Sequence, residues 1–169
     1  MNLIRRYVDL EDARVLDIGC GIGTYVKKLD EVSGEAYGVD IDPARVHEGA
    51  QTRQSRRGTL SVAVSERLPF ADASFDMVLL NEVIEHVKDD VATLREACRV
   101  LRPGGHVVIY APNRLYPFET HGVYLGKRYV FGNIPFVNYL PDLLRGRLVP
   151  HARAYTTRGL RRIVAGLDA

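Results

Sequence analysis

The first residues suited to chemistry form a glycine-rich stretch, LDIGCGIGTY, at residues 16–25. Gly19, Gly21 and Gly23 follow an apolar run at every second position. Because glycine has no Cβ, such a loop lets a ligand lie against the backbone, and a helix that follows it offers N–H groups. The pattern predicts either a nucleotide-type cofactor site or a tight structural turn.

An acidic residue stands at the distance that a nucleoside site requires. Asp40 ends an apolar run 21 residues after Gly19, where a carboxylate can accept both ribose hydroxyls of a bound nucleoside. Asp42 is explained as the N-cap of a helix that begins at Pro43. A dinucleotide site would have its third glycine at position 24, which is Thr24, so the spacing disfavours a nicotinamide cofactor.

A second group of candidates follows later in the chain, in PNRLYPFETHG at residues 112–122. Glu119 and His121 stand two residues apart and have the types of an orienting partner and a general base, with Tyr116 and His151 behind them. His86, in EVIEHV, is a third catalytic candidate on the substrate side. For each of these residues the alternative is a structural role, in which the side chain makes turn or surface hydrogen bonds only.

Alternating strands and helices position these residues. Apolar runs predict buried strands at 14–19, 35–42, 60–64, 74–81 and 106–112, and helical spacing predicts helices at 24–30, 43–54 and 89–101, the last stopped by RPGG. Five alternations are typical of an α/β, Rossmann-like, doubly wound parallel sheet with helices on both faces. Ligands of such sheets bind beyond the carboxyl ends of the strands, where strand order reverses.

We predict a single domain over residues 1–169, in which 1–112 form the cofactor-binding core. Residues 113–155 are aromatic and lack a clean period, which indicates a substrate-binding or lid insertion. Residues 156–169 predict one amphipathic helix with Thr156 or Thr157 as its N-cap. Because doubly wound sheets normally continue after such a helix, we expect this one to lack its last C-terminal strands.

Composition excludes several classes of protein. The chain is 46% apolar and 26% charged, as in a globular protein. Its apolar runs fall short of the roughly 20 residues of a membrane span, and its charged N-terminus is unlike a secretory signal, so we expect a cytoplasmic protein. Cys20 and Cys98 lack metal-site spacing and are interpreted as apolar fillers.

Charge is unevenly distributed along the chain. Residues 1–112 carry 14 Lys and Arg against 18 Asp and Glu, whereas residues 113–169 carry 9 against 3. The basic part could attract an anionic substrate, a lipid surface or nucleic acid, or it could be a solvated face.

Four segments resemble the class I S-adenosylmethionine-dependent methyltransferases, in particular the small-molecule branch labelled methyltransferase type 11. They are VLDIGCGIG, GVDIDP, LPFADASFDMVLLNEVIEHV and LREACRVLRPGGHVVIYAPN, in the family's order over roughly residues 14–113. The resemblance implies S-adenosyl-L-methionine as cofactor and S-adenosylhomocysteine as product.

The resemblance also implies a set of cofactor-binding residues. The glycines would pack against the methionine part and the ribose, Asp17 would lie near the amino group, and Asp40 would take the ribose hydroxyls. Ile41 would cover one adenine face. Many relatives have an aspartate at the position of Val64, so here the adenine amino group would need another partner. The implied set is Asp17, Gly19, Gly21, Gly23, Asp40, Ile41, Ser65, Glu66 and Asn81.

The reaction implied is methyl transfer to a small-molecule or amphipathic acceptor such as a lipid or glycan, with oxygen as the expected nucleophile. No metal is required for an in-line attack on a sulfonium methyl. Two alternatives remain: a module that binds the cofactor without turnover, and an NAD-dependent oxidoreductase. A nucleic-acid substrate is disfavoured because LNEVIEHV lacks the Asn/Asp-Pro-Pro-aromatic run of base-modifying enzymes. We expect no membrane span, and peripheral membrane contact fits the basic end.

Overall fold

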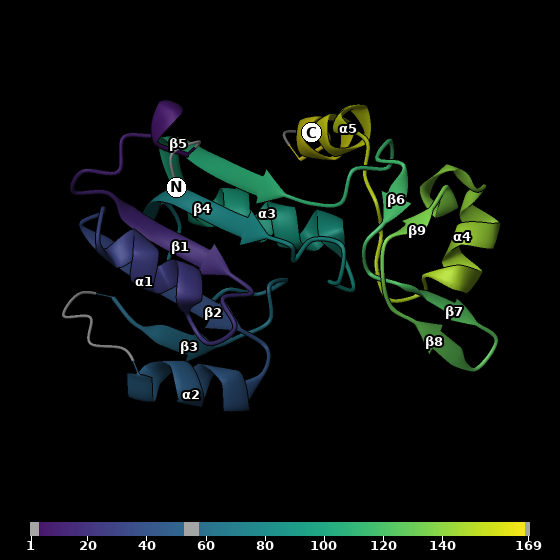
Figure 1. Ribbon diagram of the computed structural model, residues 1–169. Helices are drawn as coiled ribbons and strands as arrows, with labels where there is room; N and C mark the ends of the chain where they lie inside the picture. Colours follow the sequence, from purple (N-terminus) through teal and green to yellow (C-terminus); the bar gives the residue numbers. More distant parts are fainter. Residues whose placement is uncertain (1–3, 53–57, 168–169) are drawn as a thin grey trace. The chain divides into compact units, whose positions relative to one another are not determined.

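A computed structural model of the protein describes residues 4–52 and 58–167 (Figure 1). The chain divides into two compact units. The first comprises Met1–Val83 with Val87–Tyr110, and the second comprises Ile84–His86 with Ala111–Ala169. Each unit has its own sheet structure and its own apolar core. The single domain over residues 1–169 stays a prediction.

The first unit contains a parallel five-stranded sheet, as predicted. Its strands are β1 (Arg14–Ile18), β2 (Glu35–Asp40), β3 (Leu60–Val62), β4 (Phe75–Asn81) and β5 (Leu101–Tyr110), arranged in the order β3-β2-β1-β4-β5. All neighbouring pairs are parallel. Strand order therefore reverses between β1 and β4, which is where a sheet of this kind binds its ligands.

Three helices cover the sheet: α1 (Thr24–Asp30), α2 (Pro43–Thr52) and α3 (Asp90–Val100), and a short 3-10 turn, η1 (Ile4–Arg6), precedes β1. The connections β1-α1-β2 and β4-α3-β5 run in opposite directions across the sheet. Because such crossovers are right-handed, they place α1 and α3 on opposite faces, as Figure 1 shows. The strands between them are correspondingly buried on both sides, and Val15, Leu16, Met77, Val78 and Leu79 are fully buried.

The predicted start of the fifth strand needs correction. Asp89 caps the third helix by accepting the N–H of Ala92 at 2.9 Å, and this helix ends at Val100, one residue before its predicted end. However, β5 begins at the next residue rather than at 106. Phe75 pairs with Leu101 and Met77 pairs with His106, so RPGG forms an irregular stretch of β5 instead of a separate stop. Cys98, predicted on the apolar face, is exposed.

Cys20 fits its predicted role as an apolar filler. It lies in the core of the first unit. Burial, with the neighbouring charges of Asp17 and Asp40, raises the pKa of its thiol to about 12, so the side chain is a neutral thiol at physiological pH.

The second unit contains regular elements where the sequence predicted a long irregular insertion. Strands β6 (Phe118–Glu119) and β9 (Ile134–Pro135) pair antiparallel, as do β7 (Val123–Leu125) and β8 (Arg128–Val130). They are followed by η2 (Val137–Tyr139), α4 (Asp142–Leu148) and α5 (Thr157–Ala165). Val123, Val137, Val149 and Ala152 form its small core. These strands have two or three residues each, which is too short for a recognisable alternation.

The C-terminal helix agrees with the prediction where the structure describes it. Thr156 is the N-cap of α5, and its hydroxyl accepts the N–H of Gly159 at 3.0 Å. Residues 168 and 169 of the predicted range lie outside the described residues. Within the described part of the chain, no helix has the length and apolar character to cross a membrane.

Candidate functional site

The glycine loop lies at the carboxyl end of β1, as the sequence predicts. Gly19, Gly21 and Gly23 all have positive φ, at 72°, 55° and 79°, a region that side chains with a Cβ rarely occupy. The N–H groups of Gly19 and Cys20 both donate to the carbonyl of Val39, at 2.7 and 2.9 Å. A Cβ on Gly19 would overlap the side chain of Val83. The loop is thus held against the end of β2 in a conformation that requires glycine.

Asp40 links β2 to this loop. Its Oδ2 accepts the backbone N–H of Gly21 at 2.7 Å, and its Oδ1 accepts the N–H of Asp42 at 2.9 Å. The side chain is largely buried, with 8% of the residue exposed. Each carboxylate oxygen has two lone pairs, so Asp40 retains acceptor capacity for hydroxyl groups while it holds the loop. Asp42 caps α2 through the N–H of Ala44, at 2.9 Å, as predicted.

Two further glycines allow the loop to pack closely. A Cβ on Gly38 would lie 2.7 Å from Cys20 Sγ and 2.8 Å from Val26 Cγ2, and one on Gly49 would lie 2.5 Å from the carbonyl oxygen of Ile22. Close approach of β2 and α2 to the loop therefore depends on both residues. Neither glycine could be identified from the sequence, because isolated glycines in a strand or a helix have many explanations.

Asp17, in β1, is the most perturbed acid at this end of the sheet. It is 2% exposed, and burial, with a smaller contribution from the charge of Asp40, raises its pKa to about 8. A neighbouring cation would stabilise the ionised form of this buried carboxyl group. This environment suits the predicted contact with an amino group.

Exposed apolar side chains gather after three neighbouring strands. Ile22 follows β1, Ile41 follows β2, and Val62 ends β3 with Val64 two residues on; their exposures range from 41% to 66%. Because the carboxyl ends of parallel strands share one edge of the sheet, Ile41, Val62 and Val64 lie at the edge that carries Asp40, where the resemblance implies an adenine ring.

Ser65 and Glu66 have internal roles. The Ser65 hydroxyl is 3.2 Å from Glu66 Oε2 and 3.0 Å from Thr93 Oγ1. Glu66 Oε1 accepts the N–H of Lys88 at 3.2 Å. These side chains tie the segment after β3 to the start of α3, so the adenine contacts predicted for them would come from the backbone or from remaining lone pairs.

Asn81 ends β4 next to a strained residue. Glu82 has a φ of 55° although it is not glycine, and its N–H donates to the carbonyl of Tyr110 at 2.9 Å. Left-handed non-glycine residues carry strain of about 1–3 kcal/mol and cluster at functional sites. The sequence did not predict this feature, since backbone strain at a glutamate has no signature in one sequence.

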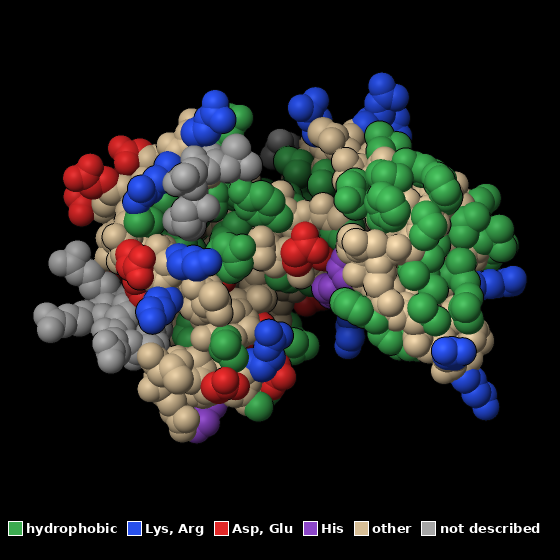
Figure 2. All heavy atoms as spheres, viewed as in Figure 1, with side chains coloured by type: hydrophobic (Ala, Val, Ile, Leu, Met, Phe, Trp, Pro, Cys, Tyr) green, Lys and Arg blue, Asp and Glu red, His purple; other side chains and the backbone are tan. Residues whose placement is uncertain are grey.

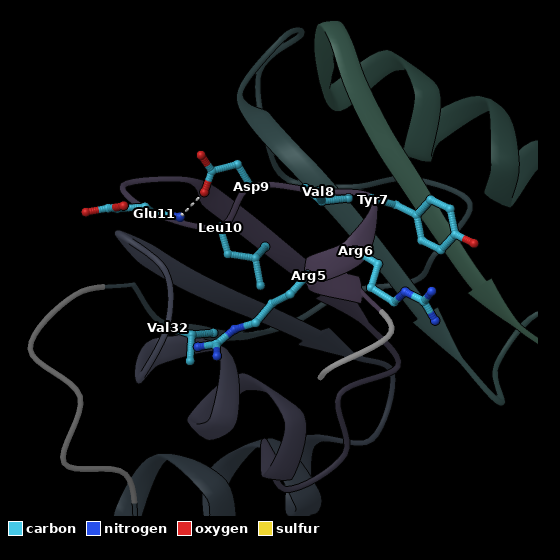
Figure 3. Close-up of a pocket in the computed structure, with 8 residues that line it drawn as sticks. All are labelled: Arg5, Arg6, Tyr7, Val8, Asp9, Leu10, Glu11 and Val32. Carbon is cyan, nitrogen blue, oxygen red and sulfur yellow. Dashed lines mark hydrogen bonds between the residues drawn. The ribbon is translucent and has the colours of Figure 1, made fainter.

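A hollow of about 580 Å³ occurs elsewhere in the first unit (Figure 3). Residues 5–11, which precede β1, line it together with Val32, which precedes β2. It therefore lies toward the amino ends of these strands, opposite to the glycine loop. Figure 3 shows its arginine side chains extended and the Asp9 carboxylate accepting the Glu11 N–H, at 3.1 Å. We assign no role to it.

The second unit brings all three predicted catalytic residues close to one another. His121 Nδ1 lies 3.1 Å from Glu119 Oε1, which also accepts the N–H of His121 at 2.9 Å. The ring centroids of His86 and His121 are 5.3 Å apart. His151 lies close to them as well, since its Nε2 donates to the carbonyl oxygen of His121 at 3.0 Å. The catalytic roles themselves stay predictions.

Glu119 is held by a buried arginine that the sequence did not single out. Arg145, in α4, is 5% exposed and donates to Glu119 Oε2 at 2.7 Å and to the Ala152 carbonyl at 2.8 Å. Burial raises the pKa of Glu119, but the His121 N–H and the Arg145 guanidinium outweigh it and hold that pKa below its usual value. Glu119 is therefore an ionised hydrogen-bond acceptor for His121.

The sequence also missed Glu85, whose carboxylate is fully buried. Its Oε1 is 3.9 Å from His86 Nε2 and 3.8 Å from His121 Nε2. The available signal in the sequence was its position next to the candidate His86 in EVIEHV. Its burial adds to this signal, because glutamate is rarely buried without a charged or coordinating partner.

The second unit has a large apolar surface. Figure 2 shows hydrophobic side chains over much of its visible face. The most exposed are Leu143, Phe131, Leu115 and Phe136, each at least 66% exposed. Apolar area of this extent indicates an interaction or binding surface.

Comparison with known proteins agrees with the geometry of the first unit. A family model described as a methyltransferase domain matches residues 16–109. A ubiquinone biosynthesis O-methyltransferase of Parvibaculum lavamentivorans is 35% identical over 130 residues, which cover 74% of this chain and 50% of that protein. A demethylmenaquinone methyltransferase of Beutenbergia cavernae is 32% identical over 174 residues, with 92% and 71% covered.

Solved structures share the fold. An S-adenosylmethionine-dependent methyltransferase of Mesorhizobium loti superposes with a TM-score of 0.72 at 18% identity, covering 98% of this chain and 78% of that one. The chain spans half or less of the length of the first curated relatives that it matches. On the family match, the chain belongs to the methyltransferase domain family, and it has the fold of class I S-adenosylmethionine-dependent methyltransferases.

Proposed function

We propose that this chain binds S-adenosyl-L-methionine at the glycine loop and transfers its methyl group to an oxygen of a small or amphipathic acceptor. The hydrogen bond from Gly21 to Asp40 carries the proposal, because it aligns the bare loop with a carboxylate that retains acceptor capacity. The same edge of the sheet offers Asp17 for an amino group and exposed Ile41 for a purine face.

The cofactor supplies an electrophilic methyl group on sulfur, so the protein has three tasks: to bind the nucleoside, align the acceptor and exclude water. Asp40 binds the ribose hydroxyls and fixes the loop. Asp17 orients the amino group. For a hydroxyl acceptor a base is also required, and His121, oriented by Glu119, is our candidate.

Two observations support oxygen and an amphipathic acceptor. One relative carries the name O-methyltransferase, and the second unit has a large exposed apolar surface. An N-methyltransferase of Rauvolfia serpentina is also 37% identical over 110 residues, so the acceptor atom must be measured.

The test incubates the full chain with S-adenosylmethionine labelled on its methyl group and with phenols and catechols, with and without an apolar tail. We expect S-adenosylhomocysteine to form and the label to appear as an aryl methyl ether, faster for tailed acceptors. His121→Asn should lower kcat more than it changes cofactor affinity. Cofactor binding without turnover on any acceptor would favour the binding-module alternative, and label on nitrogen or carbon would contradict O-methylation.

A further inference from the structure

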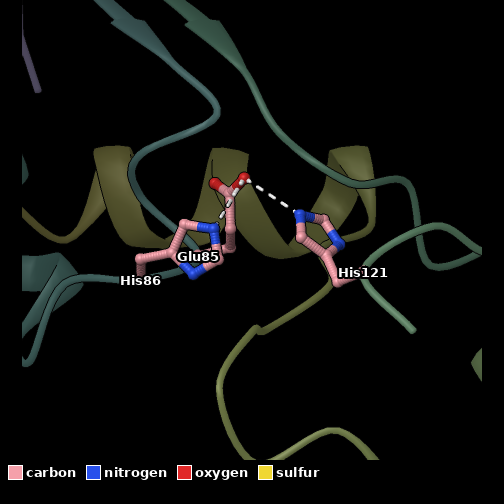
Figure 4. A group of neighbouring side chains, drawn as sticks. All are labelled: Glu85, His86 and His121. Carbon is pink, nitrogen blue, oxygen red and sulfur yellow. Dashed lines mark ion pairs between the residues drawn. The ribbon is translucent and has the colours of Figure 1, made fainter. Parts of the chain in front are cut away.

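Three potential metal ligands meet inside the second unit. Glu85, His86 and His121 each offer one ligand atom, and these three atoms lie within 4.8 Å of one another. Figure 4 shows both imidazole rings turned toward the Glu85 carboxylate. Glu85 Oε1 is 3.8 Å from His121 Nε2 and 3.9 Å from His86 Nε2.

Hydrogen bonds on the far side of each ring determine which nitrogen carries the proton. His86 Nδ1 lies 2.8 Å from the carbonyl oxygen of His151, which can only accept, so Nδ1 is the protonated nitrogen. His121 Nδ1 lies 3.1 Å from Glu119 Oε1, whose carboxylate is paired with Arg145. When either ring is in its neutral form, the lone pair is therefore on Nε2, the nitrogen that faces Glu85.

These outer contacts resemble the environment of metal-binding histidines. A ligating imidazole commonly donates its other N–H to a carboxylate or a backbone carbonyl, which fixes the ring and raises its basicity. His121 has the carboxylate partner and His86 has the carbonyl partner. The arrangement continues from His121 through Glu119 to the buried Arg145, so the ring is held by a chain of side chains.

The spacing is close to that of a metal site. Ligands that share one tetrahedral Zn²⁺ at 2.0–2.2 Å lie about 3.4 Å apart, so the two separations from Glu85 need to shorten by about half an ångström. The Glu85 carboxylate is fully buried, whereas the His86 side chain is 43% exposed. An ion can therefore reach the Glu85 carboxylate from the His86 side.

We propose that Glu85, His86 and His121 bind one divalent transition-metal ion through a carboxylate oxygen and two Nε2 atoms. The donor set selects the class of ion, because imidazole suits Zn²⁺, Fe²⁺ and Co²⁺, whereas Mg²⁺ and Ca²⁺ take oxygen ligands. Three protein ligands leave at least one position open, as in catalytic rather than structural zinc sites. The resemblance discussed above implied no metal, and this site does not depend on the proposed methyl transfer. Because the metal would occupy the lone pair of His121 Nε2, His121 would not act as a general base while the ion is bound.

The test titrates the full chain, treated with a chelator and dialysed, with CoCl₂. We expect one equivalent to bind with visible d–d absorption and with two exchangeable, contact-shifted Nδ1–H proton signals in the NMR spectrum. His86→Asn and His121→Asn should each remove one of these signals and weaken binding at least tenfold. Glu85→Gln should weaken it without removing either signal, and ZnCl₂ should displace Co²⁺.

His47→Asn is the matched control, because His47 lies exposed on α2 in the other unit. It should bind Co²⁺ like the unmodified protein. Circular dichroism checks that each variant is folded. If His121→Asn does not fold, His86→Asn alone provides the test, because the His86 side chain is the more exposed of the two. The proposal is overturned if folded protein binds no Co²⁺ at millimolar concentration, or if His86→Asn and His47→Asn bind it equally.

Discussion

Asp40 Oδ2 accepts the backbone N–H of Gly21 at 2.7 Å, which joins the end of β2 to the middle of the glycine loop. The Asp40 carboxylate thus holds a loop whose glycines have positive φ, and it also presents hydrogen-bond acceptors at the carboxyl edge of the sheet. The proposed nucleoside recognition would therefore be coupled to the loop conformation through this side chain.

Asp40→Asn should weaken S-adenosylhomocysteine binding at least tenfold. The amide keeps the size of the side chain but loses its charge and one acceptor oxygen, so either the loop contact or a ribose contact is lost. Isothermal titration measures the change. Asp42→Asn is the control, since asparagine caps helices as well as aspartate does, and it should bind the ligand within about twofold of the unmodified protein.

The raised pKa of Asp17 predicts a pH-dependent stability. In the unfolded chain this carboxyl ionises near 3.9, whereas in the folded protein its pKa is about 8. Between these values the folded state holds one more proton, so this residue's contribution to the free energy of unfolding falls as pH rises, by up to about 1.4 kcal/mol per pH unit.

Urea denaturation of the unmodified protein and Asp17→Asn at several pH values measures this contribution. Relative to the unmodified protein, Asp17→Asn should become progressively more stable from pH 5 to pH 8. A stability difference between the two that is constant over this range would show that Asp17 ionises normally in the folded state.

Gly38→Ala should destabilise the protein and impair the glycine loop. The new Cβ would lie 2.7 Å from Cys20 Sγ and from Leu60 Cδ2, and such overpacking costs about 1–3 kcal/mol. Gly146→Ala is the control, because nothing lies within 4 Å of its Cβ position in helix α4. That change should leave the free energy of unfolding unchanged or raise it by up to about 1 kcal/mol. Equal effects of the two substitutions would contradict the close packing at Gly38.

Arg145→Leu should strongly destabilise the second unit. It leaves the Glu119 carboxylate, 1% exposed, without the guanidinium at 2.7 Å, and breaking a buried ion pair from one side costs about 3–5 kcal/mol. Arg147→Leu, on the exposed side of the same helix, should change stability by less than about 0.5 kcal/mol. Thermal unfolding compares the two variants, and similar melting temperatures would mean that the Arg145–Glu119 pair is not essential.

The first unit could be predicted from sequence because its signals are local and repeated. Each strand is an apolar run of several residues, and both the helix Thr24–Asp30 and the loop glycines agree with the structure. The start of β5 was wrong because Pro103 and two glycines indicated a break between helix and strand, whereas pairing with β4 draws these residues into β5.

The second unit could be predicted only in part. Glu119 and His121 were identified as a pair because they are two residues apart, and the structure places them in hydrogen-bond contact. Arg145 was missed because it reaches this group from a distant part of the sequence. Glu85 was missed although it adjoins His86, because its burial and its contact with His121 are not visible in the sequence. Contacts between residues far apart in sequence leave no periodic pattern, and one sequence alone does not reveal them.

The measurement that tests the account most directly is a calorimetric titration of the full chain with S-adenosylhomocysteine, beside NADH. The account predicts one site with micromolar affinity for S-adenosylhomocysteine, weakened by Asp40→Asn, and no heat from NADH. A folded chain that binds neither ligand, or that binds NADH instead, would contradict the assignment of the glycine loop to a sulfonium nucleoside.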